Sequence, residues 1–274
     1  MKLIQTIILS MLCTPIMASC NNSKAINANN QAVSETSTSA VQTTSKEISK
    51  EKGVAGQIAS VTKKGKAIFL VVFNKKGADK DKAISIAKKA LAKKSNSAEI
   101  IELNTTEASN KDLITKFSLA GAPLPLIIVM DKNGIPAGGL KLAEATPDAL
   151  ADMIPSPKNS EVIKALNEKK AVFIIAYKEK MIEKKKAITN CINAAKVMKN
   201  EAAVVLLNTD NKAEKLLISN LQIDINSTEP AIYTVNKSGQ ITGTFTPKTS
   251  IAQLTVAASK VMSGCGGGCA SGCN

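Results

Sequence analysis

The stretch Ala67-Ile68-Phe69-Leu70-Val71-Val72-Phe73 is an unbroken apolar run, and it returns 104 positions later as Ala171-Val172-Phe173-Ile174-Ile175-Ala176-Tyr177. Such a run, rich in β-branched and aromatic residues, predicts a strand that is buried on both faces. Further along, the segment from Pro125 to Gly134 returns as the segment from Pro230 to Gly239, with an offset of 105. Because the offset changes by a single residue over a whole unit, the sequence indicates two copies of one domain.

The spacing of apolar residues predicts the same order of elements in both copies. The expected strands are 67–73, 98–104 and 126–130 in the first copy, with a further strand after the hairpin turn, and 171–177, 203–208, 231–235 and 240–245 in the second. The expected helices are one ending near Thr62, then 79–93, 110–119 and 146–154, the last capped by Thr146, and in the second copy 161–167, 180–199, 212–221 and 250–262. This order predicts an α/β fold with a mixed sheet flanked by helices.

The proline that opens the strand before the hairpin is the most specific of these features. Pro125 and Pro230 each lie nine residues before the glycine of the following turn. Together with the order of elements, these prolines resemble those of the thioredoxin family, in which the proline takes a cis bond and faces the redox centre. The resemblance implies two tandem thioredoxin-like domains, 54–155 and 156–262, with Pro125 and Pro230 at the family's cis-proline positions.

The redox cysteines of that family are missing from this sequence. The family places a Cys-x-x-Cys motif after the first long strand, where the N-terminus of a helix lowers the thiol pKa. The corresponding loops, 74–81 and 178–183, contain no cysteine. The resemblance therefore implies non-catalytic domains of the kind used as spacers or binding platforms. Cys191 falls inside the second copy, opposite Ala87 of the first, and we expect it to be buried by packing rather than reactive.

The N-terminal residues predict export. Lys2 is followed by a mostly apolar stretch and then by small residues, so 1–19 is interpreted as a signal peptide. The segment Met17-Ala18-Ser19-Cys20 resembles the lipobox of bacterial lipoproteins, which implies that Cys20 becomes the acylated first residue of the mature protein. The alternative is an ordinary cleaved signal. Residues 20–53 are polar and poor in large apolar side chains, which predicts a disordered tether.

The types of charged residue in the chain indicate which classes of partner it can bind. The net charge is +14, all the basic residues are lysine, and the chain has no arginine, histidine or tryptophan. Nucleic-acid recognition normally uses arginine forks and aromatic stacking, so we expect no nucleic-acid partner. The expected partners are a membrane, reached through the lipid anchor, and possible partner proteins that the sequence does not identify. The expected location is the cell envelope, on its periplasmic or extracellular face.

The C-terminal tail, 263–274, carries the one concentrated chemical feature of the chain. It holds Cys265, Cys269 and Cys273 among glycine, alanine and serine. Three interpretations stand: the thiolates wrap a soft metal ion, two of them form a disulfide that the third resolves, or the tail is an appendage without activity. Zinc sites usually combine C-x₂₋₄-C pairs with distant ligands and need four ligands, whereas the tail supplies three cysteines, so the sequence favours Cu(I) over zinc.

These features favour a membrane-anchored lipoprotein with redox-inactive thioredoxin-like domains and a metal-binding tail. We expect no enzymatic activity and assign no catalytic residue. Two alternatives remain, a thiol–disulfide oxidoreductase that uses the tail cysteines, and a non-catalytic scaffold that binds proteins in grooves beside Pro125 and Pro230.

Overall fold

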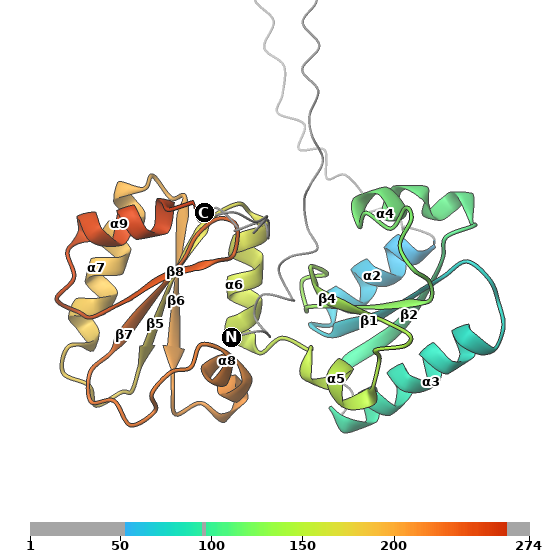
Figure 1. Cartoon of the computed structure of the whole chain (residues 1–274), viewed down its shortest axis with the longest axis horizontal. Helices are drawn as coiled ribbons and strands as arrows, with labels where there is room; N and C mark the ends of the chain where they lie inside the picture. The colour runs from blue at the N-terminus through green and yellow to red at the C-terminus, as the bar shows by residue number, and fades with distance from the viewer. Residues whose placement is uncertain (1–52, 95–96, 262–274) are drawn as a thin grey trace, which may run out of the picture.

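The computed structural model describes residues 53–94 and 97–261, which form two α/β domains side by side (Figure 1). The predictions for the signal peptide, for Cys20 and for Cys265, Cys269 and Cys273 fall outside these residues, as does nearly all of the predicted tether. Within the described ranges, no helix has the length and apolar character needed to cross a membrane.

The first domain follows the predicted order of elements. Its strands are β1 (Ala67–Phe73), β2 (Ala98–Asn104), β3 (Leu126–Met130) and β4 (Pro136–Lys141). Its helices are α2 (Val54–Lys63), α3 (Ala78–Lys93), α4 (Lys111–Lys116) and α5 (Pro147–Asp152), with the 3₁₀ turn η1 (Ala108–Asn110) before α4. The strand order is β2-β1-β3-β4. Strand β1 runs parallel to β2 and antiparallel to β3, and β3 is antiparallel to β4, so the sheet is mixed.

The second domain repeats this architecture. Its strands are β5 (Ala171–Tyr177), β6 (Ala202–Asn208), β7 (Ala231–Val235) and β8 (Ile241–Phe245). Its helices are α6 (Pro157–Asn167), α7 (Lys184–Val197), α8 (Lys215–Asn220) and α9 (Ile251–Ser259), with the 3₁₀ turn η2 (Lys212–Glu214) before α8. The order β6-β5-β7-β8 has the same strand directions as the first sheet.

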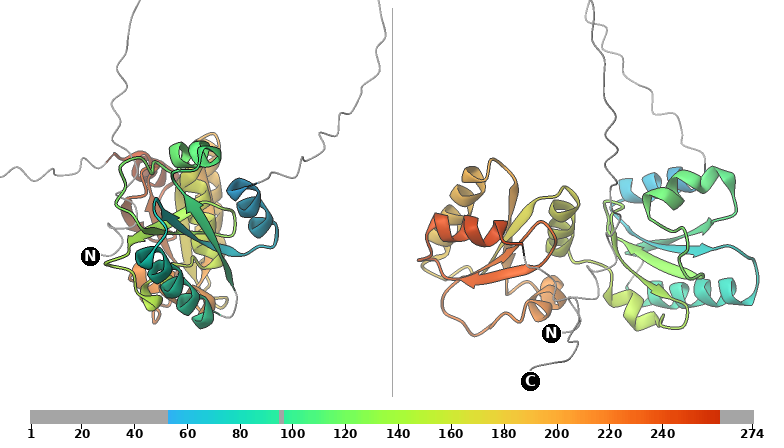
Figure 2. Two further views of the ribbon diagram at one scale, coloured as in Figure 1. Left: turned by 90° about the vertical axis from the view of Figure 1, so that its right-hand side faces the viewer. Right: turned by 45° about the horizontal axis from the view of Figure 1, so that its top comes forward.

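Each sheet is buried on both faces because its central strand is apolar throughout. In β1, Phe69 packs toward the alanines of α3 and toward α5, whereas Leu70 packs on the opposite face with α2. In β5, Phe173 packs toward α7 and α9, and Ile174 packs toward α6 and α8. Helices therefore cover both faces of both sheets (Figure 2), which is the arrangement predicted from the sequence.

The predicted helix 110–119 is shorter than its apolar spacing suggests. Helix α4 ends at Lys116, and Ser118 just beyond it takes a φ of 52°. The N–H of Leu119 then donates to the carbonyl of Ile114 at 2.9 Å, closing the helix end. Helices commonly end at a residue in the left-handed conformation, which is usually glycine. Here Ser118 takes that conformation, so the sequence gives no glycine signal for the helix end.

The predicted helix 180–199 also begins later than expected, at Lys184. Residues 178–181 form a turn instead, in which the N–H of Met181 donates to the carbonyl of Lys178 at 3.1 Å. The N–H of Lys178 in turn lies 3.2 Å from Met181 Sδ, which accepts a weak hydrogen bond. The Met181 thioether therefore stabilises a turn in the loop after β5. The spacing of apolar residues does not predict this turn.

Several helix starts follow from local side-chain chemistry. Thr146 caps α5, as predicted, by accepting a hydrogen bond from the N–H of Ala149 at 3.2 Å. Ser156 caps α6 in the same way. Ser250 and Gln253 form a reciprocal capping box at the start of α9. These caps satisfy backbone donors that the first turn of a helix leaves unpaired.

Candidate functional site

The thioredoxin resemblance places the candidate site at the edge of the first sheet where β1 ends. Val72 pairs with Leu126 across β1 and β3, so continuing this antiparallel register places Pro125 beside Phe73. The Leu124–Pro125 peptide bond is cis. The end of β1, the loop that follows it and Pro125 therefore share one edge of the sheet.

Pro230 occupies the corresponding place in the second sheet, but its backbone differs. Ala176 pairs with Ala231, the residue after Pro230. Within the described residues, only the Leu124–Pro125 peptide bond is cis, so the Glu229–Pro230 bond is trans. The cis bond that the family resemblance implied at Pro230 is therefore not present. The loop between α8 and Pro230 contains one residue more than the loop between α4 and Pro125, so the chain enters β7 by a different route.

In each domain a lysine of the following helix lies over the aromatic ring that ends the central strand. The Nζ atom of Lys80 is 4.9 Å from the centre of the Phe73 ring. The Nζ atom of Lys184 is 5.2 Å from the centre of the Tyr177 ring. Both pairs are related by the 104-residue offset of the repeat. The two copies therefore share a cation–π contact at the edge that holds cysteines in the thioredoxin family.

The charge of Lys80 at this edge is paired with a neighbouring carboxylate. Lys80 Nζ lies 2.8 Å from Glu102 Oε2, and this hydrogen bond raises the pKa of Lys80 above its usual value. The ammonium group is therefore charged at neutral pH and is not a nucleophile. The N–H of Thr105 donates to the carbonyl of Phe73 at 2.8 Å and ties the end of β1 to the loop after β2. This edge can hold polar groups in place, but it presents no thiol.

A small cavity of about 110 Å³ opens at the same edge of the second domain. Its lining includes Met181 from the loop after β5, Ala231 and Tyr233 from β7, and Asp224 and Glu229 from the loop between α8 and β7. At the positions of Met181 and Tyr233, the first domain has Gly77 and Ile128. The two copies therefore differ at the side chains that line this space.

Cys191 lies in the core of the second domain, as the sequence predicts. Its side chain, on the inner face of α7, is fully buried and packs with Phe173 and Leu254. Burial raises the pKa of the Cys191 thiol to about 12, because a thiolate would lose its hydration there. The thiolate is the reactive form of cysteine, so Cys191 is inert in the folded protein.

We expect this buried thiol to make the second domain sensitive to alkali. The unfolded chain loses the Cys191 proton near pH 9.0, whereas the folded chain retains it up to a pKa of about 12. Between these values the unfolded state binds fewer protons, so stability falls as pH rises. At pH 10.5 the folded protein should lose about 2 kcal/mol through this thiol, which urea unfolding followed by circular dichroism can measure.

A Cys191→Ala variant is the control for that measurement, since alanine occupies the corresponding position 87. Removing the sulfur should cost about 1 kcal/mol at pH 7 by leaving a small void. At pH 10.5 the order should reverse and the variant should be the more stable protein. Equal losses of stability in the two proteins between pH 7 and pH 10.5 would contradict the assignment.

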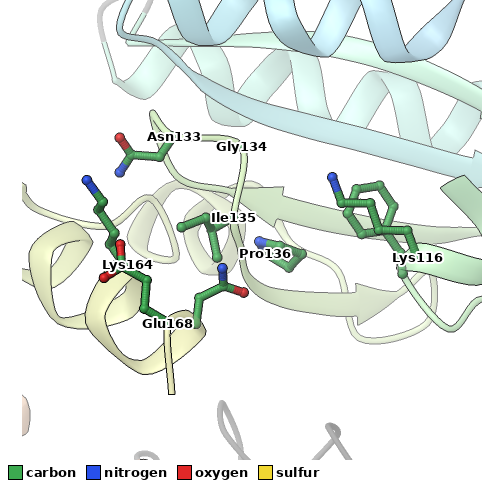
Figure 3. A pocket seen from close by; sticks show the side chains of 9 residues that line it. Lys116, Asn133, Gly134, Ile135, Pro136, Lys164 and Glu168 are labelled. Carbon is green, nitrogen blue, oxygen red and sulfur yellow. The ribbon is translucent and has the colours of Figure 1, made fainter. Parts of the chain in front are cut away.

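A larger hollow of about 420 Å³ lies away from this edge, between the β3–β4 turn of the first domain and α6 of the second (Figure 3). Lys164 lies near Asn133 at one end of it, whereas Lys116 lies at the other. Glu168 also lines the hollow, but its carboxylate is paired with Lys170 at 2.8 Å. The charged groups do not converge on one point, and the hollow is remote from Pro125, so we assign it no role.

The candidate metal ligands predicted from the sequence lie outside the described part of the chain. Cys265, Cys269 and Cys273 and the acylation residue Cys20 all fall outside it. Within residues 53–94 and 97–261, no three cysteine or carboxylate side chains cluster in a way that could hold a metal ion. The metal and lipid assignments therefore remain predictions from the sequence.

The strand order, the strand directions and the helices on both faces define two tandem thioredoxin-like domains. No protein-family model and no curated protein matches the sequence. Among solved structures, the chain is similar to the first two thioredoxin domains of Naumovozyma dairenensis Eps1p, at 12% identity over 80% of this chain and 99% of that chain, with a TM-score of 0.29.

Two further solved structures show a comparable similarity. Human ERp44 in its zinc-bound form is 12% identical over 74% of this chain and 57% of that chain, with a TM-score of 0.31. The NTD_N/C domain of alkylhydroperoxide reductase AhpF from Enterococcus faecalis is 12% identical over 74% of this chain and 96% of that chain, with a TM-score of 0.22. These scores add nothing to the assignment of the fold, which rests on the topology of the two sheets.

Sequence reasoning missed the side chains that distinguish the two copies at this edge. Aligning the repeats pairs Lys80 with Lys184 and Phe73 with Tyr177, whereas the contact within each copy is seen only in the structure. The same alignment shows Tyr233 in place of Ile128, which introduces a hydroxyl at a strand position that is apolar in the first copy. The positions of Asp224 and Glu229 beside the cavity left no such signal, because loop carboxylates are usually solvated.

Proposed function

We propose that this protein is an exported, lipid-anchored protein of the cell envelope whose thioredoxin-like domains are redox-inactive. In this proposal the domains carry a thiol-rich tail that binds a soft metal ion such as Cu(I). The working residues are Cys265, Cys269 and Cys273, and Cys20 is the lipid attachment site. The domains serve as a rigid spacer between the membrane and the tail.

The observation that supports this proposal most is the lack of a usable thiol in the folded domains. The loops after β1 and β5 contain no cysteine. Cys191 is fully buried, and its thiol has a pKa of about 12. Sulfur chemistry by the mature protein must therefore use the cysteines outside the domains.

The tail composition sets the kind of metal that we propose. A free thiol has a pKa near 8.5, so only a few per cent is thiolate at pH 7 and a bound metal must displace protons. Ordering a glycine-rich segment also costs about 1 kcal/mol or more per residue. Strong bonds between thiolate and a soft ion offset these costs better than oxygen-seeking ions such as Mg²⁺ or Ca²⁺ do, which favours Cu(I).

The test is an anaerobic titration of the reduced protein with Cu(I) in the presence of a competing chelator. The wild-type protein should withdraw a single equivalent of Cu(I) from the chelator, and its affinity should rise with pH because the thiols must lose protons. The variant with Cys265→Ser, Cys269→Ser and Cys273→Ser should lose this uptake. Cys191→Ala should retain it, since that thiol is buried.

Two outcomes would contradict the metal assignment. Equal Cu(I) uptake by the triple variant would place the site elsewhere, and no uptake by the wild type would remove it. A defined tail disulfide in freshly isolated protein that exchanges with a partner thiol would instead support the oxidoreductase alternative.

A further inference from the structure

The exposed apolar side chains are unevenly divided between the two domains. Among the described residues, the large apolar side chains that are exposed all belong to the second domain: Ile182, Ile192, Val197, Leu216, Ile225, Val256 and Val261. The first domain exposes none of this kind within residues 53–94 and 97–155. Single apolar residues on a surface are ordinary, so their common position and the charges around them decide whether they form a binding surface.

Three of these valines lie along the helix pair formed by α7 and α9. Val197 ends α7, Val256 lies in α9 and Val261 follows α9, with exposed fractions of 63%, 70% and 83%. The Asn190 side chain of α7 donates to the carbonyl of Pro247 before α9 at 3.0 Å, which holds the two segments together. Figure 1 shows this helix pair on the side of the second domain that faces away from the first, so the first domain does not cover it.

The C-terminal ends of α7 and α9 meet the same hairpin. The Asn236 side chain, in the turn after β7, donates to the carbonyl of Lys260 at 2.9 Å. The next residue in the turn, Lys237, pairs at 2.6 Å with Glu201, which lies between α7 and β6. The last turns of both helices therefore lie at one edge of the domain, and the side chains that they expose share that edge.

The repeat supplies the equivalent surface in the first domain, formed by α3 and α5. Leu150 of α5 and Leu254 of α9 are 104 positions apart, and both are fully buried. Ala87 of α3 and Cys191 of α7 have the same offset and are also fully buried. Residues 104 positions apart therefore occupy the same place on these helices.

In the first domain, two ion pairs join α3 to α5 on this surface. Lys93 pairs with Asp148, and Lys94 pairs with Asp152 at 3.7 Å. The four equivalent positions of the second domain all carry apolar side chains: Val197, Met198, Ala252 and Val256. Exposed ion pairs contribute little to stability, so this exchange alters the character of the surface more than the stability of the domain.

The lysines of this surface have no acidic neighbours on the two helices. Helices α3 and α5 together contain five lysines and four aspartates, whereas α7 and α9 contain four lysines and no acidic residue. The first turn of α7 is partly neutralised by Glu179 and Glu183 of the preceding loop. At the other end, Lys196 and Lys260 are exposed and form no ion pair with a described residue. Unpaired positive charge therefore lies where the valines are exposed.

Together these residues form the α7–α9 patch: Lys196, Val197, Val256, Lys260 and Val261. A second copy of the chain fits this patch poorly, because a symmetric interface would bring the lysines of both copies together. Three valine side chains also fall short of the area of about 800 Å² per partner that a stable protein interface buries. An anionic bilayer supplies both kinds of contact, since its headgroups attract lysine and its interface accepts apolar side chains.

We propose that the α7–α9 patch binds the surface of an anionic lipid bilayer. The three valines enter the interfacial region, and Lys196 and Lys260 lie at the headgroup phosphates. Each lysine strengthens such binding by about fivefold, so the contact is weak and reversible by itself. The inference goes beyond the proposed function, because it uses neither the lipid on Cys20 nor the tail, and the domains act as a spacer whenever the patch is released.

Sedimentation with lipid vesicles tests the patch. The protein is the polypeptide 21–274, which contains every described residue and carries no acyl group, and it is kept reduced so that its cysteines form no disulfides. It should bind vesicles of equal parts phosphatidylglycerol and phosphatidylcholine at least about tenfold more tightly than vesicles of phosphatidylcholine alone. Salt at about 1 M should remove most of this difference. Equal binding to the two kinds of vesicle, or binding to neither, would overturn the proposal.

Charge variants separate the patch from the overall charge of the chain, which is +14. Lys196→Gln with Lys260→Gln should weaken binding to the anionic vesicles about tenfold or more. Lys88→Gln with Lys89→Gln makes the same change of charge on exposed lysines of α3 in the first domain, and should weaken binding less than about threefold. If the two double variants lose affinity equally, binding follows the overall charge and the proposal is wrong.

Valine variants test the apolar part of the patch at unchanged charge. Val197→Ser with Val256→Ser should weaken binding to the anionic vesicles about fivefold. Ile182→Ser with Ile225→Ser removes two exposed side chains from the loops before α7 and β7, outside the patch, and should leave binding unchanged. All four side chains are exposed, so the fold should be retained, which circular dichroism checks. The same loss in both double variants would contradict the patch.

Sedimentation velocity without lipid tests a second copy of the chain as the occupant. The polypeptide 21–274 should be monomeric at the concentrations used with vesicles. A dimer that Val197→Ser with Val256→Ser converts to a monomer would assign the patch to self-association and overturn the membrane assignment. Failure of lipidation at Cys20, or of Cu(I) uptake by the tail, leaves these results unaffected, so the two proposals fail separately.

Discussion

A Cys20→Ala variant is expected to lose the lipid mass of the mature protein and to leave the detergent phase in a phase-partition experiment. The reason is that Cys20 is the predicted acylation site, and the folded domains contain no helix able to span a membrane among their described residues. A single acyl chain binds a bilayer only marginally, so stable anchoring takes more than one. Removing all acyl chains should lower membrane partitioning by roughly a hundredfold or more.

The matched control is Cys13→Ala, which changes a cysteine inside the apolar stretch of the predicted signal peptide. This variant should be processed and partitioned like the wild type. Mass spectrometry of the isolated proteins identifies the first residue and any attached lipid. Wild-type protein with an unmodified N-terminus that partitions like Cys20→Ala would show that Cys20 is not an anchor.

A Glu214→Ala variant is expected to destabilise the second domain by about 3 kcal/mol. The Glu214 carboxylate is completely buried. It accepts hydrogen bonds from the Ser156 hydroxyl at 2.5 Å and from the N–H of Lys158 at 3.1 Å. These donors lie at the start of α6, where a negative charge also interacts favourably with the helix dipole. Without the carboxylate, the donors at this junction lose their acceptor.

Urea unfolding followed by tyrosine fluorescence measures this loss in the relevant domain. The chain has two tyrosines and no tryptophan, and both tyrosines, Tyr177 and Tyr233, lie in the second domain. Glu161→Ala is the control, because Glu161 pairs with Lys158 on the exposed surface of the same helix at 2.7 Å. That variant should lose less than about 1 kcal/mol. A similar loss in the two variants would show that the buried carboxylate adds nothing special.

The strands were the most predictable part of this protein. The boundaries of β1 and β5 agree with their apolar runs, because a strand buried on both faces cannot contain a polar residue without leaving it unsolvated. The turn before β4 was equally clear. Asp131 accepts the N–H groups of Asn133 and Ile135, at 2.8 Å and 2.9 Å, so its side chain holds the turn locally.

The helix ends and the candidate site were predicted less completely. Met181 closes a turn at the start of the expected helix, and the trans bond before Pro230 departs from the family pattern. Each depends on how a loop meets the sheet edge rather than on residue spacing. The burial of Cys191 was predicted correctly, because its counterpart is an alanine on the buried face of the equivalent helix.

The sequence by itself determined the repeat, the α/β class, the central strands and the absence of cysteines from the loops after them, because apolar periodicity and composition act locally along the chain. Only the tertiary structure decided which side chains meet at the edges of the sheets. Glu214 meets Ser156 across 58 positions, and Tyr233 lines a cavity with Asp224 and Met181. Such meetings depend on strand register and loop length, which bring together residues that no local pattern connects.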